Sequence, residues 1–205
     1  YIATGARVPH PSQLHREGWE RSLFPSHKTV LAVSVPSNCY TPKSKQEPPM
    51  PELQTIGIVG AGTMGNGIAH VCARSGFNVL LCDLEQSFLD RGLATIDKNL
   101  AREVSKEKLT AQQSAEARSR IISTTDREAL SACNFVIEAA TEKIEIKSAL
   151  FKDLDRILPA EAILASNTSS ISITKLAAQT TRPAQVIGMH FFNPVPVMPA
   201  TNHPT

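Results

Sequence analysis

A glycine-rich turn, Gly60-Ala61-Gly62-Thr63-Met64-Gly65, separates an apolar run, residues 55–59, from a segment whose apolar residues have helical spacing. The pattern GxGxxG between a strand and a helix is typical of sites that bind the pyrophosphate of a dinucleotide. Gly60 is expected to form the tight turn, Gly62 to let the backbone approach the pyrophosphate, and Gly65 to let the helix pack on the strand. Free N–H groups at the helix N-terminus would then face the phosphates. A glycine-rich turn without a ligand is the alternative interpretation.

An acidic residue, Asp83, ends the next apolar segment, residues 78–82. It follows Gly65 by 18 residues, close to where a dinucleotide-binding fold places the carboxylate that binds the adenosine ribose. A carboxylate there accepts hydrogen bonds from both ribose hydroxyls and repels a 2′-phosphate. The sequence therefore predicts NAD(H) rather than NADP(H). Without this spacing, an acidic turn residue after a strand would be the simpler interpretation.

Three polar groups of residues follow later strand-like runs: Thr141-Glu142 with Lys147, residues 166–170, and residues 190–194. Ligands of open parallel sheets bind beyond the carboxyl ends of the strands, so we expect these groups to meet around a nicotinamide. Oxidation of a secondary alcohol needs a hydride to leave carbon and a proton to leave the hydroxyl. Histidine, with a reference pKa of about 6.5, suits the proton step. A serine hydroxyl and an asparagine amide can hold the oxygen in line.

Each of these candidate residues also has a structural interpretation. Ser169 or Ser170 can simply cap the following helix, a common role of serine. His190 can be a histidine packed beside the two phenylalanines that follow it. Asn193 precedes a proline, which is ordinary turn chemistry. Spacing alone does not choose between the catalytic and the structural interpretation.

The elements that must position these residues alternate between strands and helices. Apolar runs predict strands near residues 55–59, 78–83, 121–125, 135–139, 162–165 and 185–189. Between them, apolar residues recur at helical spacing in two long stripes: Leu89, Leu93, Ile96, Leu100 and Val104, then Ile144, Ile146, Leu150, Phe151, Leu154, Ile157 and Leu158. The alternation predicts an α/β fold with a doubly wound, mostly parallel sheet.

Residues 1–49 differ from the rest, because they hold the single tryptophan, both tyrosines and many of the prolines. Within them only residues 30–35 resemble a strand, and residues 36–51 have the composition of a linker. We expect a poorly ordered extension over 1–49, a dinucleotide-binding domain over 50–198 with Met50 as the functional start, and a divergent tail over 199–205. The extension shows neither an arginine-rich presequence nor a secretory apolar segment.

The composition excludes several classes of function. Hydrophobic residues make up 41% and charged residues 20% of the chain, as is usual for globular proteins. A net charge of +2 gives no reason to expect nucleic acid or an acidic membrane as a partner. No apolar run is long enough to cross a bilayer. The four cysteines lack metal-ligand spacing, so we expect no metal, and we interpret them as core residues in a reducing, cytoplasmic compartment.

The segment from Leu53 to Met198 closely resembles the NAD-binding domain of 3-hydroxyacyl-CoA dehydrogenases, especially the bacterial 3-hydroxybutyryl-CoA type. The matching stretches are Gly60 to Gly67, Asp83, Glu138 to Glu142, Ala165 to Ser170, and Gly188 to Met198. The runs SNTSS and HFFNPVPVM are the most specific of these. The resemblance implies a Rossmann-type fold, NAD as the cofactor, and interconversion of (S)-3-hydroxyacyl-CoA and 3-oxoacyl-CoA in fatty-acid metabolism.

The resemblance also implies roles for single residues. His190 matches the family's catalytic base in oxidation and acid in reduction, Ser169 the serine that binds the substrate oxygen, and Asn193 the asparagine that orients the reacting group. Four further residues match binding positions: Glu142 and Lys147 at the NAD site, and Asn99 and Lys106 at coenzyme A. From the sequence alone Lys106 would belong to a solvated helix face, whereas a cation there can meet a nucleotide phosphate.

The family pattern breaks after Met198. Relatives carry a glutamate on the next strand that pairs with the histidine and holds its orientation, as carboxylates do in other histidine-based sites. Here Asn202 stands at that position, and no acidic residue follows His190. The family's C-terminal helical domain, which closes over the acyl chain and forms the homodimer interface, has no counterpart in the sequence. We expect weak turnover or none, because an unpaired histidine in an open site loses orientation and water exclusion, and we expect exposed apolar surface.

Three hypotheses about function follow. The first is an NAD-dependent 3-hydroxyacyl-CoA dehydrogenase, present as an N-terminal portion. The second is a non-catalytic NAD-binding module, which the lack of an acid after His190 favours. The third is a related dehydrogenase of another 3-hydroxy acid, similar to the lambda-crystallin type. Asn99 and Lys106 favour the first hypothesis over the third.

Overall fold

The computed structural model of the protein describes residues 55–197. The predicted extension over 1–49, its strand at 30–35, Met50 and the tail with Asn202 all lie outside the described residues. The predicted domain boundaries at 50 and 198 therefore stay predictions.

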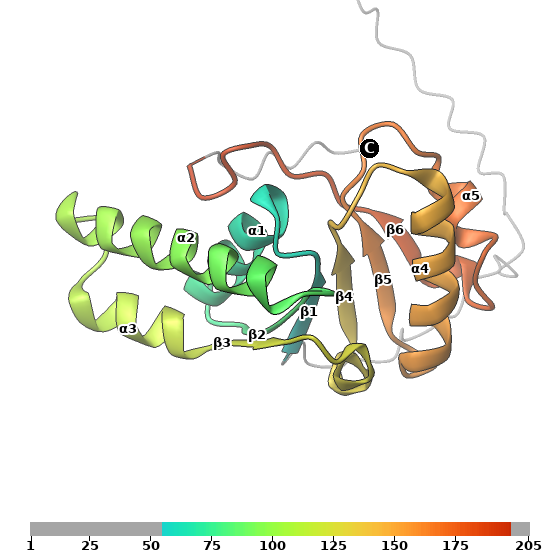
Figure 1. Ribbon diagram of the computed structural model, residues 1–205, viewed down its shortest axis with the longest axis horizontal. Coiled ribbons are helices and arrows are strands. Elements are labelled where there is room, and N and C mark those ends of the chain that lie inside the picture. The colour runs from blue at the N-terminus through green and yellow to red at the C-terminus, as the bar shows by residue number, and fades with distance from the viewer. Residues whose placement is uncertain (1–54, 198–205) are drawn as a thin grey trace, which may run out of the picture. The chain divides into compact units, whose positions relative to one another are not determined.

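Six strands of the described residues form one parallel sheet in the order β3-β2-β1-β4-β5-β6 (Figure 1). Their bounds are β1 Thr55–Val59, β2 Asn78–Cys82, β3 Ile121–Thr124, β4 Phe135–Glu138, β5 Ile163–Ser166 and β6 Val186–Gly188. The carboxyl ends of the central strands are in register, with Val59 opposite both Cys82 and Glu138, and Glu138 opposite Ser166. Because the strand order reverses between β1 and β4, a crevice for ligands is expected beyond these ends.

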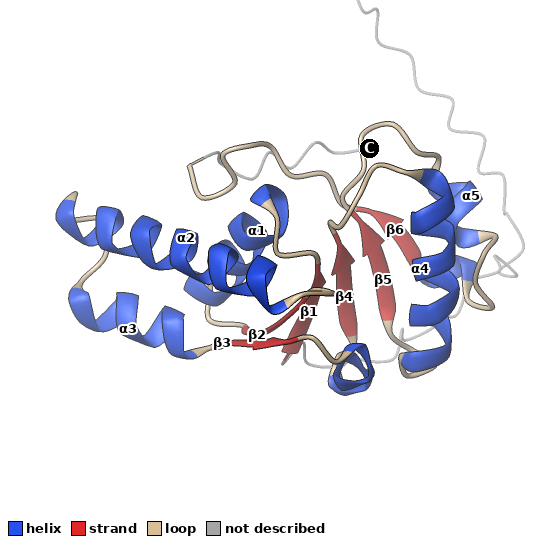
Figure 2. Ribbon diagram, viewed as in Figure 1, coloured by secondary structure: helices blue, strands red, loops and turns tan. Residues whose placement is uncertain are grey.

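The helices lie on both faces of the sheet (Figure 2). Their bounds are α1 Thr63–Arg74, α2 Gln86–Ser105, α3 Ala111–Ser119, the 3-10 helix η2 Arg127–Ala132, α4 Ile144–Ile157, α5 Ile173–Ala177 and the 3-10 helix η3 Pro183–Gln185. One buried cluster joins α1, α2 and α3 to the residues of β1 and β2 on one face of the sheet, such as Ile58 and Leu81. The other joins η2, α4 and α5 to Val136 and Leu164. The predicted doubly wound α/β fold is confirmed, and the sheet is wholly parallel.

The hydropathy of the helices bears on membranes. Among residues 55–197, none of the helices combines the length and the apolar character that a membrane crossing requires.

A buried histidine joins α1 to α2. Nε2 of His70 lies 3.2 Å from Oε2 of Glu103, and Nη1 of Arg74 donates to the other carboxylate oxygen at 2.7 Å. Within the described part of the chain, Nδ1 of His70 is buried and has no hydrogen-bond partner. Burial lowers the pKa of His70 below 6.5, although the charge and hydrogen bond of Glu103 oppose this effect. The fold therefore favours the neutral imidazole.

We expect the free energy of unfolding to fall on acidification because of His70. The folded-state pKa lies below the reference value of 6.5, so the unfolded chain binds more protons as the pH falls through that value. Urea unfolding between about pH 8 and about pH 5.5 should show this decrease, and His70→Leu should flatten it. A wild-type stability that rises on acidification, or an unchanged slope in the variant, would contradict the prediction.

Candidate functional site

The glycine turn between β1 and α1 has the close approaches that its sequence predicts. Gly60 has a φ of 101°, and a Cβ atom there would lie 2.7 Å from Cα of Ala140. A Cβ on Gly65 would lie 1.7 Å from the carbonyl oxygen of Gly60, so the helix packs directly on the turn. A Cβ on Gly62 would meet no atom within 4 Å. The turn therefore presents open space at Gly62, at the N-terminus of α1, and this fits a pyrophosphate.

The acidic residue after β2 is tied to this turn. Oδ2 of Asp83 accepts a hydrogen bond from the N–H of Ala61 at 2.6 Å, and Oδ1 accepts one from the N–H of Leu84 at 2.7 Å. Asp83 remains half-buried rather than enclosed. A carboxylate held beside the phosphate-binding turn fits the ribose of the same dinucleotide. The preference for NAD over NADP stays a prediction.

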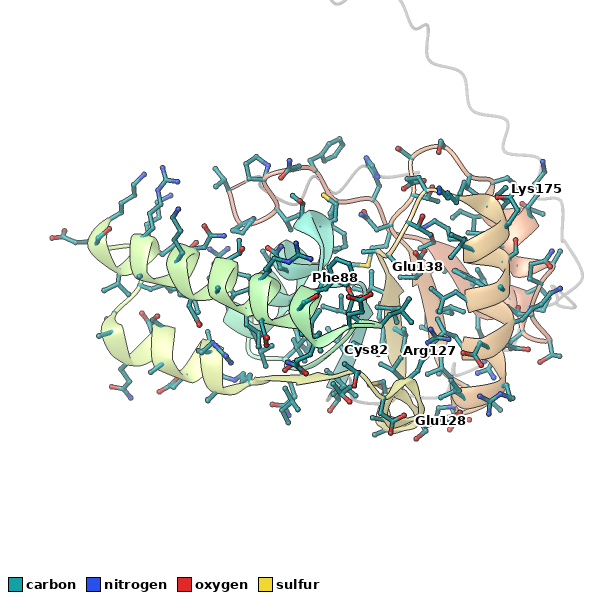
Figure 3. All side chains as sticks on the ribbon, viewed as in Figure 1. Cys82, Phe88, Arg127, Glu128, Glu138 and Lys175 are labelled. Atoms are coloured by element: carbon teal, nitrogen blue, oxygen red, sulfur yellow. The ribbon has the colours of Figure 1, made fainter. Side chains whose placement is uncertain are left out.

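A pocket of about 830 Å³ lies next to Asp83. Its walls come from the ends of β1 and β2, the start of α2, the loop after β4, η2 and one face of α4. Leu84, Phe88 and Ile146 are large apolar side chains that line it and are exposed to solvent. Figure 3 labels Cys82, Phe88 and Arg127, which lie around this pocket. An apolar pocket that shares walls with Gly62 and Asp83 fits the adenosine portion of a dinucleotide.

The two most specific polar runs meet at the same edge of the sheet, beyond β5 and β6. The N–H of Phe191 donates to Oδ1 of Asn167 at 2.9 Å, and the N–H of Met189 donates to the carbonyl of Ser166 at 3.0 Å. These bonds join the segment of Ser169 to the segment that carries His190 and Asn193. All three candidate catalytic side chains are exposed to solvent. The expected meeting of the two runs is confirmed.

Glu142 organises the loop that carries Ser169. Its Oε2 accepts hydrogen bonds from the hydroxyl of Thr168 at 2.6 Å and from the hydroxyl of Ser170 at 3.3 Å. Both neighbours of Ser169 are therefore held by one carboxylate from the loop after β4. Glu142 is itself exposed, so its predicted contact with NAD stays a prediction.

The structural interpretations of these residues have mixed outcomes. The residue at the N-cap of α5 is Ser172, so the idea that Ser169 or Ser170 caps this helix is wrong. The ring of His190 does contact that of Phe192 edge-on, with ring centroids 4.9 Å apart. Asn193 lies in a bend, as the turn interpretation predicts.

Lys147 lies in a fully buried polar network that sequence reasoning did not find. Its ammonium group pairs with Oε2 of Glu138 and donates to the hydroxyl of Ser166 at 3.2 Å. The hydroxyl of Ser166 donates to the same carboxylate at 2.9 Å, and the other carboxylate oxygen accepts from the N–H of Ala140 at 2.9 Å. The network joins β4, β5 and the first turns of α4, and it supports a loop that lines the pocket. A direct contact between Lys147 and NAD stays a prediction.

The predicted coenzyme A residues lie on α2 or at its end. Asn99 is half-buried, and Lys106 is the exposed C-cap residue two turns further along. Their role stays a prediction. Among residues 55–197, no group of three or more histidine, cysteine or acidic residues is arranged to hold a metal ion.

Comparison with known proteins agrees with this geometry. The family model described as 3-hydroxyacyl-CoA dehydrogenase, NAD binding domain, matches residues 55–201. The 3-hydroxybutyryl-CoA dehydrogenase of Bradyrhizobium diazoefficiens is 51% identical over 146 residues, which cover 71% of this chain and 50% of the relative. The 3-hydroxyadipyl-CoA dehydrogenase of Escherichia coli is 46% identical over 149 residues, 73% of this chain and 31% of the relative.

A solved structure shows the same likeness. The crystal structure of (S)-3-hydroxybutyryl-CoA dehydrogenase from Ralstonia eutropha matches with a TM-score of 0.70 and 53% identity, covering 71% of this chain and 52% of that one. The chain thus spans about half the length of several proteins that it matches. The glycine turn, Asp83 and the two polar runs lie within the matched region, and NAD is the cofactor that this domain binds. The chain belongs to the 3-hydroxyacyl-CoA dehydrogenase family, of which it carries the NAD-binding domain.

Proposed function

We propose that the chain is the NAD-binding portion of an enzyme that interconverts (S)-3-hydroxyacyl-CoA and 3-oxoacyl-CoA in fatty-acid metabolism. The hydrogen bond between Phe191 and Asn167 carries this proposal. It brings the segments of Ser169 and His190 together at the sheet edge that also holds the glycine turn. Two relatives are named for 3-hydroxybutyryl-CoA and 3-hydroxyadipyl-CoA, and these names support 3-hydroxyacyl-CoA thioesters as the substrate class.

The proposed mechanism assigns one task to each polar side chain. Residues 60–65 and Asp83 would hold NAD, which supplies hydride acceptance and donation when bound. His190 takes the proton from the substrate hydroxyl during oxidation and returns it during reduction. The hydroxyl of Ser169 donates a hydrogen bond to the substrate oxygen, and Asn193 orients the same group. Glu142 keeps the loop of Ser169 in place through Thr168 and Ser170.

Partners and location are also proposals. Asn99 and Lys106 are proposed to contact coenzyme A, and homodimer formation is proposed from the family resemblance. Three described cysteines, Cys72, Cys82 and Cys133, are free and buried, and burial raises the pKa of each thiol to about 11. Unpaired cysteines are usual in reducing compartments, and we propose the cytoplasm.

A second candidate function is a non-catalytic NAD-binding module. Within residues 55–197, the His190 ring packs edge-on against Phe192 and forms no ion pair with a carboxylate. An imidazole without such a partner is poorly oriented for proton transfer. The two candidates make different predictions for a single assay.

The assay follows NADH fluorescence during a titration and then adds acetoacetyl-CoA to the same sample. If the dehydrogenase proposal holds, NADH is consumed, and His190→Gln lowers that rate by roughly a hundredfold while NADH affinity stays unchanged. Binding without consumption in the wild type supports the non-catalytic module. Consumption with free acetoacetate but not with the thioester supports a dehydrogenase of another 3-hydroxy acid. Full activity in His190→Gln would overturn the catalytic role of this residue.

A further inference from the structure

An ion pair lies in the wall of the pocket beside Asp83. Nη1 of Arg127, at the start of η2, donates to Oδ2 of Asp153 on α4. Both side chains are about one-third exposed, at 30% and 32%. Both line the pocket that Gly62 and Asp83 also line. The pair is therefore accessible to whatever occupies this pocket.

The pair and Asp83 belong to different walls of the pocket, because Asp83 follows β2, whereas Arg127 lies on η2 and Asp153 on α4. Since α4 begins after β4 and runs back along the sheet, Asp153 lies about 13 Å along the helix from Ile144. With the ribose at Asp83, the adenine base would extend from Asp83 into the pocket. In adenosine the amino group stands at the opposite end from the ribose hydroxyls. A base that crosses the pocket from Asp83 toward η2 and α4 would therefore present its amino group to Arg127 and Asp153.

Apolar side chains beside the pair suit the faces of a planar ring. Leu84 is 75% exposed, Phe88 41% and Ile146 52%, and all three line the pocket. Large apolar side chains exposed around one concavity commonly mark a site where a ligand covers them. They cannot distinguish one purine from another, because every purine has the same apolar faces. Any discrimination must come from polar groups at the ring edge.

The charges of the pair match the edge of adenine. The adenine amino group is a donor, and its ring nitrogens N1 and N7 are acceptors. A carboxylate only accepts hydrogen bonds and a guanidinium only donates them. The hydrogen bond from Arg127 holds the pKa of Asp153 below its usual range, although burial opposes this effect, so the carboxylate stays ionised at neutral pH. Oδ1 of Asp153 also accepts from Arg156 at 3.1 Å, which leaves further lone pairs on the carboxylate.

We propose that Arg127 and Asp153 determine the base specificity of the dinucleotide site. Asp153 accepts a hydrogen bond from the adenine amino group, and Arg127 donates one to a ring nitrogen. In hypoxanthine an oxygen replaces the amino group and N1 carries a hydrogen, so the carboxylate faces an acceptor. The pair therefore favours NADH over its hypoxanthine analogue. This inference rests on NAD binding and not on the proposed chemistry at His190.

The alternative role of the pair is purely structural, because it connects η2 to α4. Titration of the wild-type chain with NADH and with reduced nicotinamide hypoxanthine dinucleotide, followed by nicotinamide fluorescence, separates the two roles. We expect NADH to bind about tenfold more tightly, since one hydrogen bond to a charged group is lost and an acceptor is placed against a carboxylate. Equal affinities would overturn the proposal without any variant.

Two variants then assign the effect to the pair. In Asp153→Asn the affinities for NADH and for its hypoxanthine analogue should differ by no more than about threefold, because an amide can either donate or accept a hydrogen bond. Arg156→Gln is the matched control, since it removes another ion-pair partner of Asp153 but does not line the pocket. It should keep the wild-type ratio, and thermal unfolding of each variant shows that it is folded. An unchanged ratio in Asp153→Asn, or failure of both dinucleotides to bind the wild type, would overturn the proposal. Binding with discrimination but without turnover would leave it standing and refute only the dehydrogenase activity.

Discussion

Replacing Gly65 by alanine is expected to abolish NADH binding and to lower the free energy of unfolding by about 3 kcal/mol or more. The added methyl group would lie 1.7 Å from the carbonyl oxygen of Gly60, and backbone at that distance cannot give way without moving the helix. Helix α1 must therefore shift away from β1, and the free N–H groups at its N-terminus shift with it. Chemical denaturation and NADH titration measure the two effects.

Replacing Gly62 by alanine is the matched comparison, because it should remove binding without removing stability. The methyl group would meet no atom within 4 Å, and the φ of −63° at this residue suits alanine. Stability should stay the same or rise by a few tenths of a kcal/mol. The methyl group would occupy the space that a pyrophosphate needs, so NADH affinity should fall by roughly tenfold to a hundredfold.

Gly76→Ala, at the other end of α1, is the control for lost stability. Gly76 has a φ of 96° and open space around its Cβ position, so alanine there is strained by about 1 kcal/mol or more but far from the turn. NADH affinity of Gly76→Ala should stay at the wild-type value.

If Gly62→Ala binds NADH normally, the dinucleotide does not approach the backbone at Gly62, and the predicted role of the second glycine is wrong.

Much of the fold follows from apolar patterning alone. The run at 55–59 is a strand with the predicted bounds, since buried parallel strands are apolar on both faces, and the strand predicted over 78–83 ends one residue earlier, at Cys82. The later strands differ by one or two residues at their ends, because hydrogen bonding rather than hydropathy decides where a strand ends. The wholly parallel order follows once each strand is succeeded by a crossover.

The candidate site was less predictable, because polar pairs between distant elements have no period in the sequence. On α4 the sequence places Ile146 in the apolar stripe, yet this residue is 52% exposed and lines the pocket. Lys147 takes the inward place beside Leu150 instead. Its spacing of three residues from Leu150 was a usable signal, as was a glutamate, Glu138, at the end of a buried strand. The pair between Arg127 and Asp153 gave no comparable signal.

Replacing Lys147 by methionine is expected to lower the free energy of unfolding by about 3–5 kcal/mol. Glu138 would keep its hydrogen bonds from Ser166 and Ala140 but would lose its counter-charge in a fully buried place. Removing one partner of a buried pair leaves an uncompensated charge, which is far more destabilising than the loss of a surface ion pair. Urea unfolding measures this change. Lys143→Met, at the exposed N-cap of the same helix, is the control and should stay within about 0.5 kcal/mol of the wild type.

The double variant Glu138→Gln with Lys147→Met decides how Lys147 acts toward NAD. Neutral groups of similar size often replace a buried ion pair at little cost, so most of the lost stability should return. The ammonium group is enclosed in the network, so we expect the stable double variant to bind NADH within about threefold of the wild type. If Lys147 contacts the cofactor directly, the double variant should bind NADH weakly even though its stability returns. If the double variant is stable and binds NADH as the wild type does, Lys147 is a positioning residue that neutralises Glu138, whose carboxylate holds the loop of Ala140.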